Sequence, residues 1–216
     1  MMAADDAVDR FVAARLIGIV RLDDVELAVE SARCAIEAGL AAVEVTFTLP
    51  GAAVAIAQLR ASHPQVLIGA GTVRSDAEME AAADAGAQFL VAPGLNPMLL
   101  EAAQRRGLTM IPGVMTASEI DLALREGAEV LKLFPAEPNG PGYLASMLQP
   151  FPNARLVPTG GISSRNASEY LKAGAAAVAM GSSLFPARRI AAEGPEVVRP
   201  LVEEALAAVR PADRKE

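Results

Sequence analysis

The 216-residue chain contains no tryptophan, one cysteine and one histidine, and each scarcity excludes a kind of chemistry. A single cysteine, Cys34, cannot form an intramolecular disulfide, and it does not supply the ligand set of a structural zinc site. Cys34 falls within a helical pattern and is predicted to be buried, whereas His63 is predicted to lie in a solvated loop between a helix and a strand. The predicted chemistry therefore uses neither imidazole nor thiolate, and we expect no metal and no cofactor.

The sequence also lacks a basic patch and a long apolar run. Its net charge is −7, spread over the chain, which argues against nucleic acid and anionic membranes as partners. No segment approaches the roughly 20 apolar residues of a membrane span. The first residues, 1–6, carry acids where a signal peptide needs a basic start, so we expect a cytoplasmic protein. Any anion that the protein binds must be held locally.

What the sequence has in abundance is short apolar segments that alternate with helical patterns. Eight strands are predicted at residues 16–21, 42–47, 67–72, 89–94, 109–114, 130–135, 155–160 and 177–181. Helices are predicted near 5–15 and at 24–38, 52–62, 75–85, 97–106, 116–126, 143–148, 165–173 and 195–209, with 182–194 irregular. Ser75 and Thr116 begin patterns typical of capping boxes, and glycines follow five of the helices.

Strands that are apolar on both faces and alternate with helices predict a parallel sheet covered by helices. Eight such units, about twenty residues apart, predict an α/β fold: a single (β/α)8 TIM barrel over residues 1–216, with the N-terminal lead helix closing its bottom. The alternative is a doubly wound open sheet. Against it, no Gly-x-Gly-x-x-Gly motif opens the first helix, and no linker divides the chain.

Lys132 stands out because it lies in the middle of the apolar strand at 130–135. Burial disfavours a charged ammonium group, which lowers the pKa of a lysine and makes its amine a usable nucleophile. The alternative is a lysine whose stem packs along the strand while its head reaches solvent. The strand alone does not decide between these two interpretations.

Other polar residues occur at the ends of the predicted strands, where a barrel carries its active site. Glu44 lies inside the second strand with Thr46 and Thr48 in the same parity, Thr72 ends the third strand, and Arg21 ends the first. Glu44 is a candidate acid/base group, and the alternative for it is a structural ion pair with Lys132 or Arg21. Arg21 is alternatively an exposed strand end.

Two glycine-rich turns, at 159–164 and 180–183, follow the last two strands. Glycines let backbone N–H groups approach an anion, and a following helix N-terminus adds partial positive charge. This arrangement is typical of barrel phosphate sites. A lysine in an apolar strand, a nearby acid, hydroxyls and a phosphate cradle together favour Schiff-base chemistry on a phosphorylated oxo compound.

Several short motifs resemble one known family in order and spacing over nearly the whole chain. They occupy residues 44–46, 69–72, 92–95, 111–114, 131–136 and 158–162. The chain resembles the 2-keto-3-deoxy-6-phosphogluconate (KDPG) aldolase and 4-hydroxy-2-oxoglutarate aldolase family. The resemblance implies a class I aldolase that cleaves a phosphorylated 2-keto acid to pyruvate and glyceraldehyde 3-phosphate, and it implies a homotrimer.

The resemblance also implies roles for individual residues. Lys132 matches the Schiff-base lysine, and Glu44 matches the general acid/base. Arg21 and Thr72 match positions that hold the pyruvoyl carboxylate. The remaining matches are the pocket-lining Phe134, Pro93 and Pro112 and the phosphate-loop residues Gly160, Gly161, Gly181 and Ser182.

The chain departs from part of the family at Thr48, where some members carry arginine. The loss of that cation makes Arg21 more important for binding the substrate carboxylate. Thr159 resembles the gluconate-type enzymes, since galactonate-specific relatives tend to have an aliphatic residue there.

Other functions remain open at the level of sequence. Within the family these are cleavage of 4-hydroxy-2-oxoglutarate or of 2-dehydro-3-deoxy-6-phosphogalactonate. Outside it, a non-covalent phosphate-binding synthase or isomerase would use Lys132 as an electrostatic clamp, and a non-catalytic barrel would only bind the metabolite. Arg188 and Arg189, in the segment predicted to be irregular, are candidates for phosphate contact or for simple solvent exposure.

Overall fold

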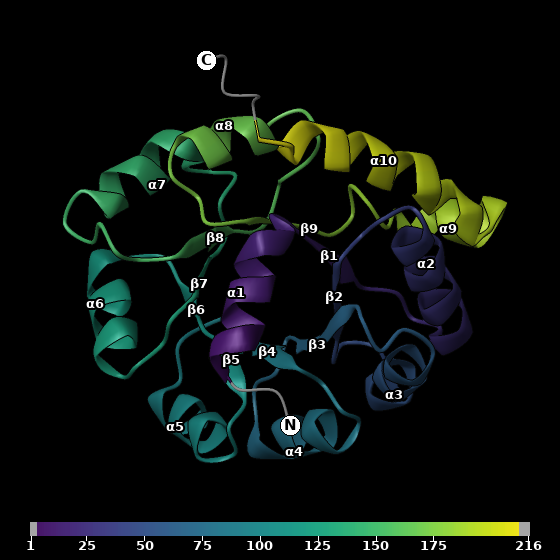
Figure 1. The fold of residues 1–216 in the computed structure, drawn as a ribbon, viewed down its shortest axis with the longest axis horizontal. Coiled ribbons are helices and arrows are strands. Elements are labelled where there is room, and N and C mark those ends of the chain that lie inside the picture. The colour runs from purple at the N-terminus through teal and green to yellow at the C-terminus, as the bar shows by residue number, and fades with distance from the viewer. Residues whose placement is uncertain (1–3, 212–216) are drawn as a thin grey trace.

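The computed structural model describes residues 4–211, in which short parallel strands alternate with helices (Figure 1). The strands are β1 (Leu16–Val20), β2 (Ala42–Thr46), β3 (Leu67–Gly71), β4 (Phe89–Val91), β5 (Thr109–Ile111), β6 (Gly113–Val114), β7 (Leu131–Leu133), β8 (Leu156–Pro158) and β9 (Val178–Met180). The helices are α1 (Ala4–Ala14), α2 (Val25–Glu37), α3 (Ala52–Ser62), α4 (Asp76–Asp84), α5 (Pro97–Arg105), α6 (Ala117–Arg125), α7 (Gly140–Leu148), α8 (Ala167–Lys172), α9 (Ala187–Glu193), η1 (Pro195–Val197) and α10 (Val198–Val209).

The strands form two parallel sheets whose order follows the chain. One sheet has the order β5-β4-β3-β2-β1-β9, and the other has the order β6-β7-β8. Pro112 separates β5 from β6, and an isolated parallel bridge joins Thr159, after β8, to Ala179 in β9. Helices α2 to α10 surround the strands on the outside (Figure 1). This arrangement lacks the reversal of strand order that a doubly wound sheet requires.

The eight predicted strands are all present, although most are shorter than predicted. The fifth is divided at Pro112, since proline has no N–H to donate to a ladder. The prediction that residues 182–194 are irregular was wrong, because α9 occupies Ala187–Glu193. That helix follows Pro186, ends at Gly194 with a positive φ, and carries an Arg189–Glu193 ion pair four residues apart. Arg189 is therefore engaged by a carboxylate.

The predicted helix ends are largely confirmed. Thr116 forms a complete capping box with Glu119. Ser75 caps α4, but the Glu78 carboxylate accepts from the N–H of Arg74 rather than from that of Ser75. The glycines that follow α2, α4, α5, α6 and α8 all have positive φ, as expected of left-handed C-terminal caps: Gly39, Gly86, Gly107, Gly127 and Gly174.

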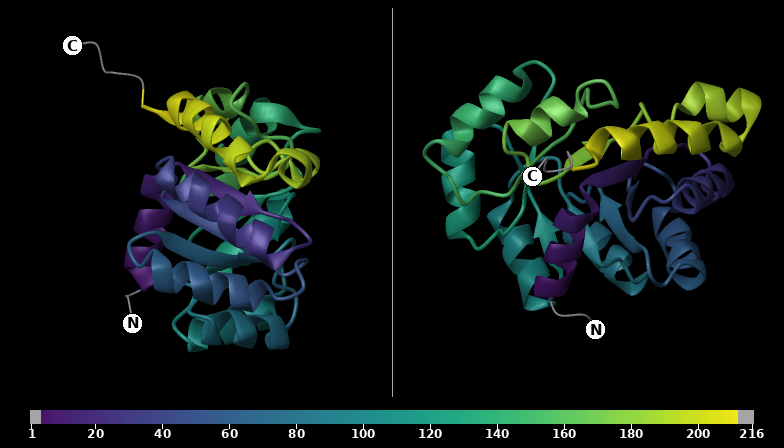
Figure 2. Two further views of the ribbon diagram at one scale, coloured as in Figure 1. Left: turned by 90° about the vertical axis from the view of Figure 1, so that its right-hand side faces the viewer. Right: turned by 45° about the horizontal axis from the view of Figure 1, so that its top comes forward.

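Alternating residues along the strands form two apolar layers. The outer layer packs against the surrounding helices. The inner layer lies among the strands and includes residues from α1. It consists of Val8, Phe11, Ile17, Ile19, Ala42, Leu67, Phe89, Val91, Ile111, Val130, Val157, Ala177 and Ala179. Helix α1 lies across one end of the strands (Figure 2), as predicted for the lead helix.

The inner layer sets the direction of the residues that follow it, because side chains alternate along a strand. Ala42 and Val130 belong to this layer, and Glu44 and Lys132 lie two residues further along the same strands. Both charged residues therefore continue the interior column toward the C-terminal ends of the strands, opposite α1. None of the helices within residues 4–211 is both long and apolar enough to cross a membrane.

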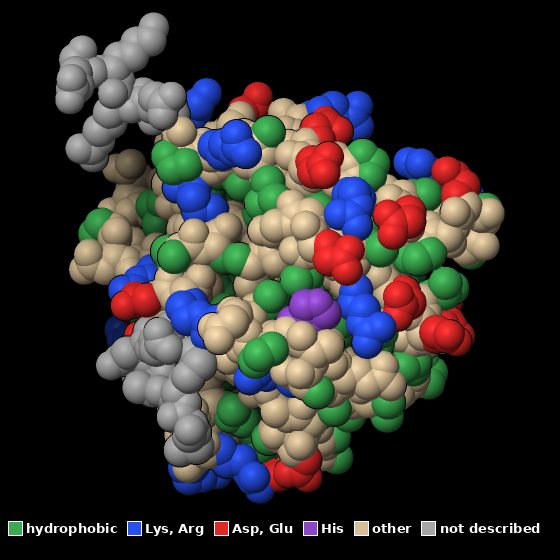
Figure 3. All heavy atoms as spheres, turned by 45° about the vertical axis from the view of Figure 1, so that its right-hand side comes forward, with side chains coloured by type: hydrophobic (Ala, Val, Ile, Leu, Met, Phe, Trp, Pro, Cys, Tyr) green, Lys and Arg blue, Asp and Glu red, His purple; other side chains and the backbone are tan. Residues whose placement is uncertain are grey.

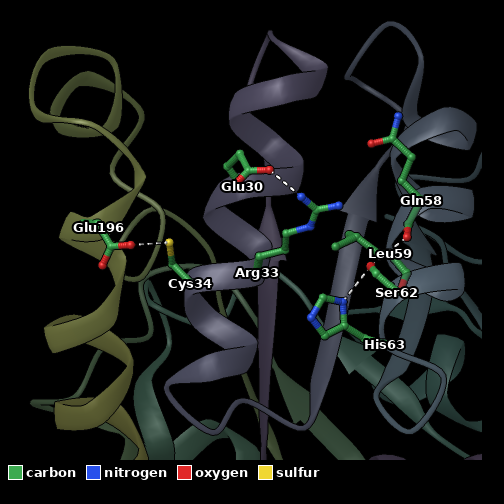
Figure 4. A network of polar contacts seen from close by, with 8 residues as sticks. All are labelled: Glu30, Arg33, Cys34, Gln58, Leu59, Ser62, His63 and Glu196. Atoms are coloured by element: carbon green, nitrogen blue, oxygen red, sulfur yellow. Dashed lines mark hydrogen bonds and ion pairs between the residues drawn. The ribbon is translucent and has the colours of Figure 1, made fainter.

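The two residues set aside on sequence grounds take part in local contacts away from these strand ends (Figure 4). The Cys34 thiol donates to a carboxylate oxygen of Glu196 at 3.3 Å. Burial, reinforced by that contact, raises the pKa of Cys34 to about 11, so the group is a thiol and not a thiolate. His63 caps α3, and its Nδ1 lies 2.8 Å from the Ser62 hydroxyl.

Acidic and basic side chains are interspersed over the face drawn in Figure 3. Most arginines of the described chain that appear in ion pairs do so with a carboxylate three or four residues away, as in Arg74–Glu78 and Arg125–Asp121. Such surface pairs contribute little to the stability of the fold, about 0–1 kcal/mol each.

Candidate active site

Lys132 is the central residue of β7, and its side chain is 4% exposed. Its neighbours across the sheet are Gly113 on β6 and Val157 on β8. Burial lowers the pKa of Lys132, and the positive charge of Arg21 lowers it further, while the negative charge of Glu44 opposes both. The Nζ atom also lies 5.0 Å from the ring centroid of Phe134. Burial and the charge of Arg21 favour the neutral amine, whereas Glu44 and the Phe134 ring favour the ammonium form.

Glu44 lies on β2 and is 2% exposed. Burial raises the pKa of Glu44, although the positive charges of Lys132 and Arg21 act in the opposite direction. Its Oε1 atom has no hydrogen-bond partner among the described residues. Space for the carboxyl group comes from Gly71, where a Cβ atom would overlap the Glu44 carboxyl group.

Glu44 and Lys132 shift each other's pKa, yet among residues 4–211 no hydrogen bond or ion pair within 4.0 Å joins them. The structural ion pair considered from the sequence is therefore not formed as a direct contact. An acid with raised pKa and an amine with lowered pKa that act on each other form a pair suited to exchanging protons.

A cavity of about 440 Å³ opens beside Lys132 at the C-terminal ends of β1, β7, β8 and β9. Eight of the predicted site residues line it: Arg21, Lys132, Phe134, Thr159, Gly160, Gly161, Gly181 and Ser182. The sequence placed these residues on four different strands or turns, and the fold brings them to one cavity wall. A volume of this size is in the range of sites for small ligands.

The other five predicted site residues do not line this cavity. Glu44 is buried beside it, and Pro112 is buried between β5 and β6. Thr72 directly follows β3, with a φ of 57° that is unusual for a residue other than glycine, and Pro93 is exposed after β4. Thr48 lies in the turn after β2 and is exposed.

The hydroxyls of the β2 end are engaged with the backbone and with each other. Thr46 Oγ1 lies 3.2 Å from the carbonyl oxygen of Val20, to which it donates, and 2.8 Å from Thr48 Oγ1. Thr46 is fully buried. Thr48 thus extends a small hydrogen-bonded group next to β1 and supplies no charge. Arg21 is an arginine whose charge acts on both Lys132 and Glu44.

The turn after β8 presents backbone N–H groups to the cavity. Gly160 and Gly161 have φ values of 91° and 75°, which residues with a Cβ rarely adopt. The Asn166 side chain holds the turn, since its Oδ1 accepts from the N–H of Ser163 and its Nδ2 donates to the carbonyl of Gly161. In the described chain, the N–H groups of Gly161 and Ile162 donate to no protein acceptor. Such a turn is suited to binding an anion.

Sequence reasoning missed several residues of the cavity wall. These are Ile19, Arg165, Phe185 and Ala187. The lining residues Ile162, Ser163 and Ser183 lie within the two predicted glycine-rich turns. Ser183 donates to the carbonyl of Ile162 at 2.7 Å and so ties the two glycine-rich turns together. Arg165 could have been found from its position four residues after Gly161, since the turn at 159–164 was already identified as a phosphate loop.

The lining of the cavity carries charge of one sign. Its cations are Arg21 and Arg165, next to the basic Lys132, and the described lining includes no aspartate or glutamate. The chain as a whole has a net charge of −7. A concentration of cations and free N–H groups in an otherwise acidic protein selects for an anionic ligand.

A parallel α/β fold with a buried strand lysine, a buried acid and an anion-binding cavity defines a lysine-dependent α/β enzyme of the Schiff-base type. Comparison with known proteins narrows this class. The family model described as "KDPG and KHG aldolase" matches residues 8–200, and the chain belongs to that family.

Individual relatives agree with the family model. The 2-dehydro-3-deoxy-phosphogluconate aldolase of Treponema pallidum is 40% identical over 193 residues, which are 89% of this chain and 92% of that protein. The KHG/KDPG aldolase of Escherichia coli K12 is 34% identical over 88% of this chain and 90% of its own length. The KDPG aldolase of Legionella pneumophila, solved with pyruvate as a covalent carbinolamine intermediate, superimposes with a TM-score of 0.85 at 32% identity, covering 92% of this chain and 97% of that one.

Proposed function

We propose that this protein is a class I aldolase that cleaves 2-dehydro-3-deoxy-6-phosphogluconate to pyruvate and glyceraldehyde 3-phosphate. The observation that carries the proposal is Lys132, a buried strand lysine of lowered pKa on the wall of a cationic cavity. The 40% identity to a relative named for this activity supports the same reaction.

The reaction begins with attack of the neutral Lys132 amine on the C2 ketone of the substrate. The resulting carbinolamine loses its hydroxyl as water, with Glu44 as the proton donor, and a protonated imine forms. The raised pKa of Glu44 supports this role, because a carboxyl group of raised pKa holds a proton more readily and can donate it. Arg21 and Thr72 hold the pyruvoyl carboxylate. Because position 48 is a threonine, no second arginine takes part in this contact.

The imine then accepts the electrons of the bond that breaks. The Glu44 carboxylate removes the proton of the C4 hydroxyl, the C4 carbonyl forms, and the electron pair of the C3–C4 bond moves toward the imine nitrogen. Glyceraldehyde 3-phosphate leaves and an enamine remains on Lys132. Protonation of this enamine at C3 and addition of one water release pyruvate and restore the amine.

The remaining predicted residues shape the two ends of the substrate site. Phe134, Pro93 and Pro112 line the pyruvoyl end, and Thr159 lies between the two ends. The backbone groups of Gly160, Gly161, Gly181 and Ser182 bind the phosphate. Support for this phosphate site comes from the free N–H groups of Gly161 and Ile162 in the turn after β8.

Borohydride trapping tests the proposal. Reduction in the presence of pyruvate should add a pyruvate-derived mass to Lys132, as read by peptide mass spectrometry. Lys132→Ala should abolish both the adduct and turnover. Glu44→Gln should keep the fold and slow turnover by about 10²–10⁴-fold, the usual range for general acid–base catalysis. An adduct on another lysine, or none at all, contradicts the assignment and favours a non-covalent synthase or isomerase. An absence of pyruvate release with retained substrate binding favours a non-catalytic barrel.

A second substrate has support from the relatives. The Escherichia coli protein carries the name KHG/KDPG aldolase, so cleavage of 4-hydroxy-2-oxoglutarate, which has the same pyruvoyl half, is the alternative activity. A structure titled "Native KDPGal structure" is 28% identical with a TM-score of 0.82, which keeps the galactonate epimer as a further alternative. Comparison of kcat/KM for the three substrates decides between them, and we expect the gluconate to have the largest value.

Four further features are part of the same proposal: the closed barrel, the single domain, the homotrimer and the cytoplasmic location. The two sheets act as one eight-membered (β/α)8 barrel, with β5 and β6 as one strand interrupted at Pro112 and the Thr159–Ala179 bridge as the closing link. Residues 1–216 form one domain, although its first three and last five residues lie outside the described ones. The homotrimer and the cytoplasmic location stay predictions, and light scattering of the purified protein measures the first.

A further inference from the structure

Arg165 is the one cation on the cavity wall that the proposed mechanism does not use. It lies on the wall with Gly160, Gly161 and Ser163, in the segment that leads into α8. Its side chain is exposed. Within residues 4–211 its guanidinium forms no hydrogen bond and no ion pair, although the chain is rich in carboxylates. An arginine that is unpaired and lines the cavity next to a turn with free N–H groups is available to a ligand.

The charges around the turn explain why a cation is needed there. The Glu137 side chain packs against Gly161, at the place that a Cβ atom of Gly161 would occupy. Its carboxylate therefore lies close to the N–H groups that are to bind an anion, and it repels a doubly charged phosphate. Arg21 and Lys132 belong to the other end of the cavity, where they act on Glu44. Arg165 is thus the cation at the turn.

We propose that Arg165 is a specificity-determining residue that binds the phosphate of the substrate and so selects phosphorylated over unphosphorylated 2-keto acids. This inference rests on the proposed function and deepens it. Backbone N–H groups alone bind an anion without distinguishing strongly between a phosphate and a weaker acceptor. A guanidinium adds charge-assisted hydrogen bonds of specific geometry, which only the charged phosphate of the substrate can use. The contact acts on binding and leaves the chemistry at Lys132 unchanged.

The test compares Arg165→Gln with the unchanged protein on the phosphorylated substrate and on its dephosphorylated analogue, with pyruvate release coupled to lactate dehydrogenase. For the phosphorylated substrate we expect KM to rise and kcat/KM to fall by roughly 10–100-fold, since contacts of this kind are among the stronger hydrogen bonds. We expect kcat to stay within about twofold and the dephosphorylated analogue to be unaffected. Arg165→Lys should restore part of the loss.

Arg188→Gln is the matched control, because Arg188 is also exposed and unpaired among residues 4–211 but does not line the cavity. It removes the same charge and should change kcat/KM by less than twofold. An equal loss in both variants would show a general field effect and overturn the role of Arg165. An equal loss on both substrates in Arg165→Gln, or none on either, would overturn it as well.

Borohydride trapping with pyruvate separates this inference from the proposed function, because pyruvate has no phosphate. Trapping should be the same in Arg165→Gln and in the unchanged protein. If the unchanged protein forms no adduct, the aldolase proposal fails. If it forms the adduct and Arg165→Gln keeps its full kcat/KM on the phosphorylated substrate, the role of Arg165 alone fails.

Discussion

Burial in the same interior shifts the pKa values of Lys132 and Glu44 in opposite directions. Burial penalises the charged form of each, so it lowers the pKa of the amine and raises the pKa of the acid. Their mutual attraction acts the other way, yet they make no direct contact that would hold both charges. Burial thus favours the uncharged form of both groups, which the proposed imine formation requires.

Arg21 gives a prediction for the pH dependence of the first step. Its positive charge lowers the pKa of Lys132, so Arg21→Gln should raise that pKa. Attack requires the neutral amine, and a higher pKa reduces the neutral fraction at any given pH. The acid limb of the rate of borohydride trapping, measured at saturating pyruvate, should therefore move to higher pH.

Arg165→Gln is the control for this shift, since Arg165 lines the same cavity but is not among the charges that act on Lys132. Its acid limb should coincide with that of the unchanged protein. If the acid limb of the trapping profile stays in place in Arg21→Gln, or moves to lower pH, the charge of Arg21 does not lower the pKa of Lys132.

At the scale of elements, β3 supplies the room that the site requires. Its inward-facing residues are Leu67, Gly69 and Gly71, and their side chains become smaller toward the site. A Cβ atom at Gly69 would overlap the Phe89 ring, and one at Gly71 would overlap the Glu44 carboxyl group. Two glycines in a buried strand weaken it, but here they make room for the Phe89 ring and the Glu44 carboxyl group.

Gly71→Ala should therefore displace Glu44 without touching the cavity lining. A displacement of about 1 Å in a reacting group can cost about 100-fold in rate, and we expect a loss of that order in kcat. The matched control is Gly94→Ala, because no atom lies within 4 Å of the added Cβ atom there. Circular dichroism should show both variants folded. If Gly71→Ala retains full kcat, the position of Glu44 does not limit the reaction.

At the scale of the whole molecule, α1 completes the core at the end opposite the site. Phe11 of α1 is 2% exposed, and its ring meets that of Phe89 edge to face at 5.1 Å between centroids. The inner layer therefore runs from a helix at one end of the strands to the polar residues at the other. Stability and chemistry are located at opposite ends of the same column of side chains.

Phe11→Ala should accordingly lower the free energy of unfolding by about 3–5 kcal/mol, the usual cost of removing a buried aromatic side chain. Urea unfolding measures this loss. The kcat of the folded protein should stay within a few-fold, because the cavity lies at the C-terminal strand ends. Phe151→Ala, at a half-buried phenylalanine outside the inner layer, should cost less. If Phe11→Ala lowers the free energy of unfolding by no more than Phe151→Ala does, α1 does not complete the core.

Most of the fold could be predicted because each strand and helix carries its own local signal. Apolar runs, capping boxes such as that of Thr116, and glycines such as Gly39 depend on residues a few positions apart. The exceptions have local causes as well. A proline divides the fifth strand, and α9 is too short for its periodicity to stand out between Pro186 and Gly194.

The sequence by itself determined the alternation of strands and helices, the anomaly of Lys132 and the two glycine-rich turns, since these are patterns of neighbouring residues. Only the tertiary structure decided that Glu44 and Lys132 lack a direct ion pair, that Gly71 makes room for the carboxyl group, and that Arg165 joins the cavity wall. Distances between side chains on separate strands depend on strand register and on how the interior column is filled. Both arise from contacts between residues far apart in the chain, and no local pattern records them.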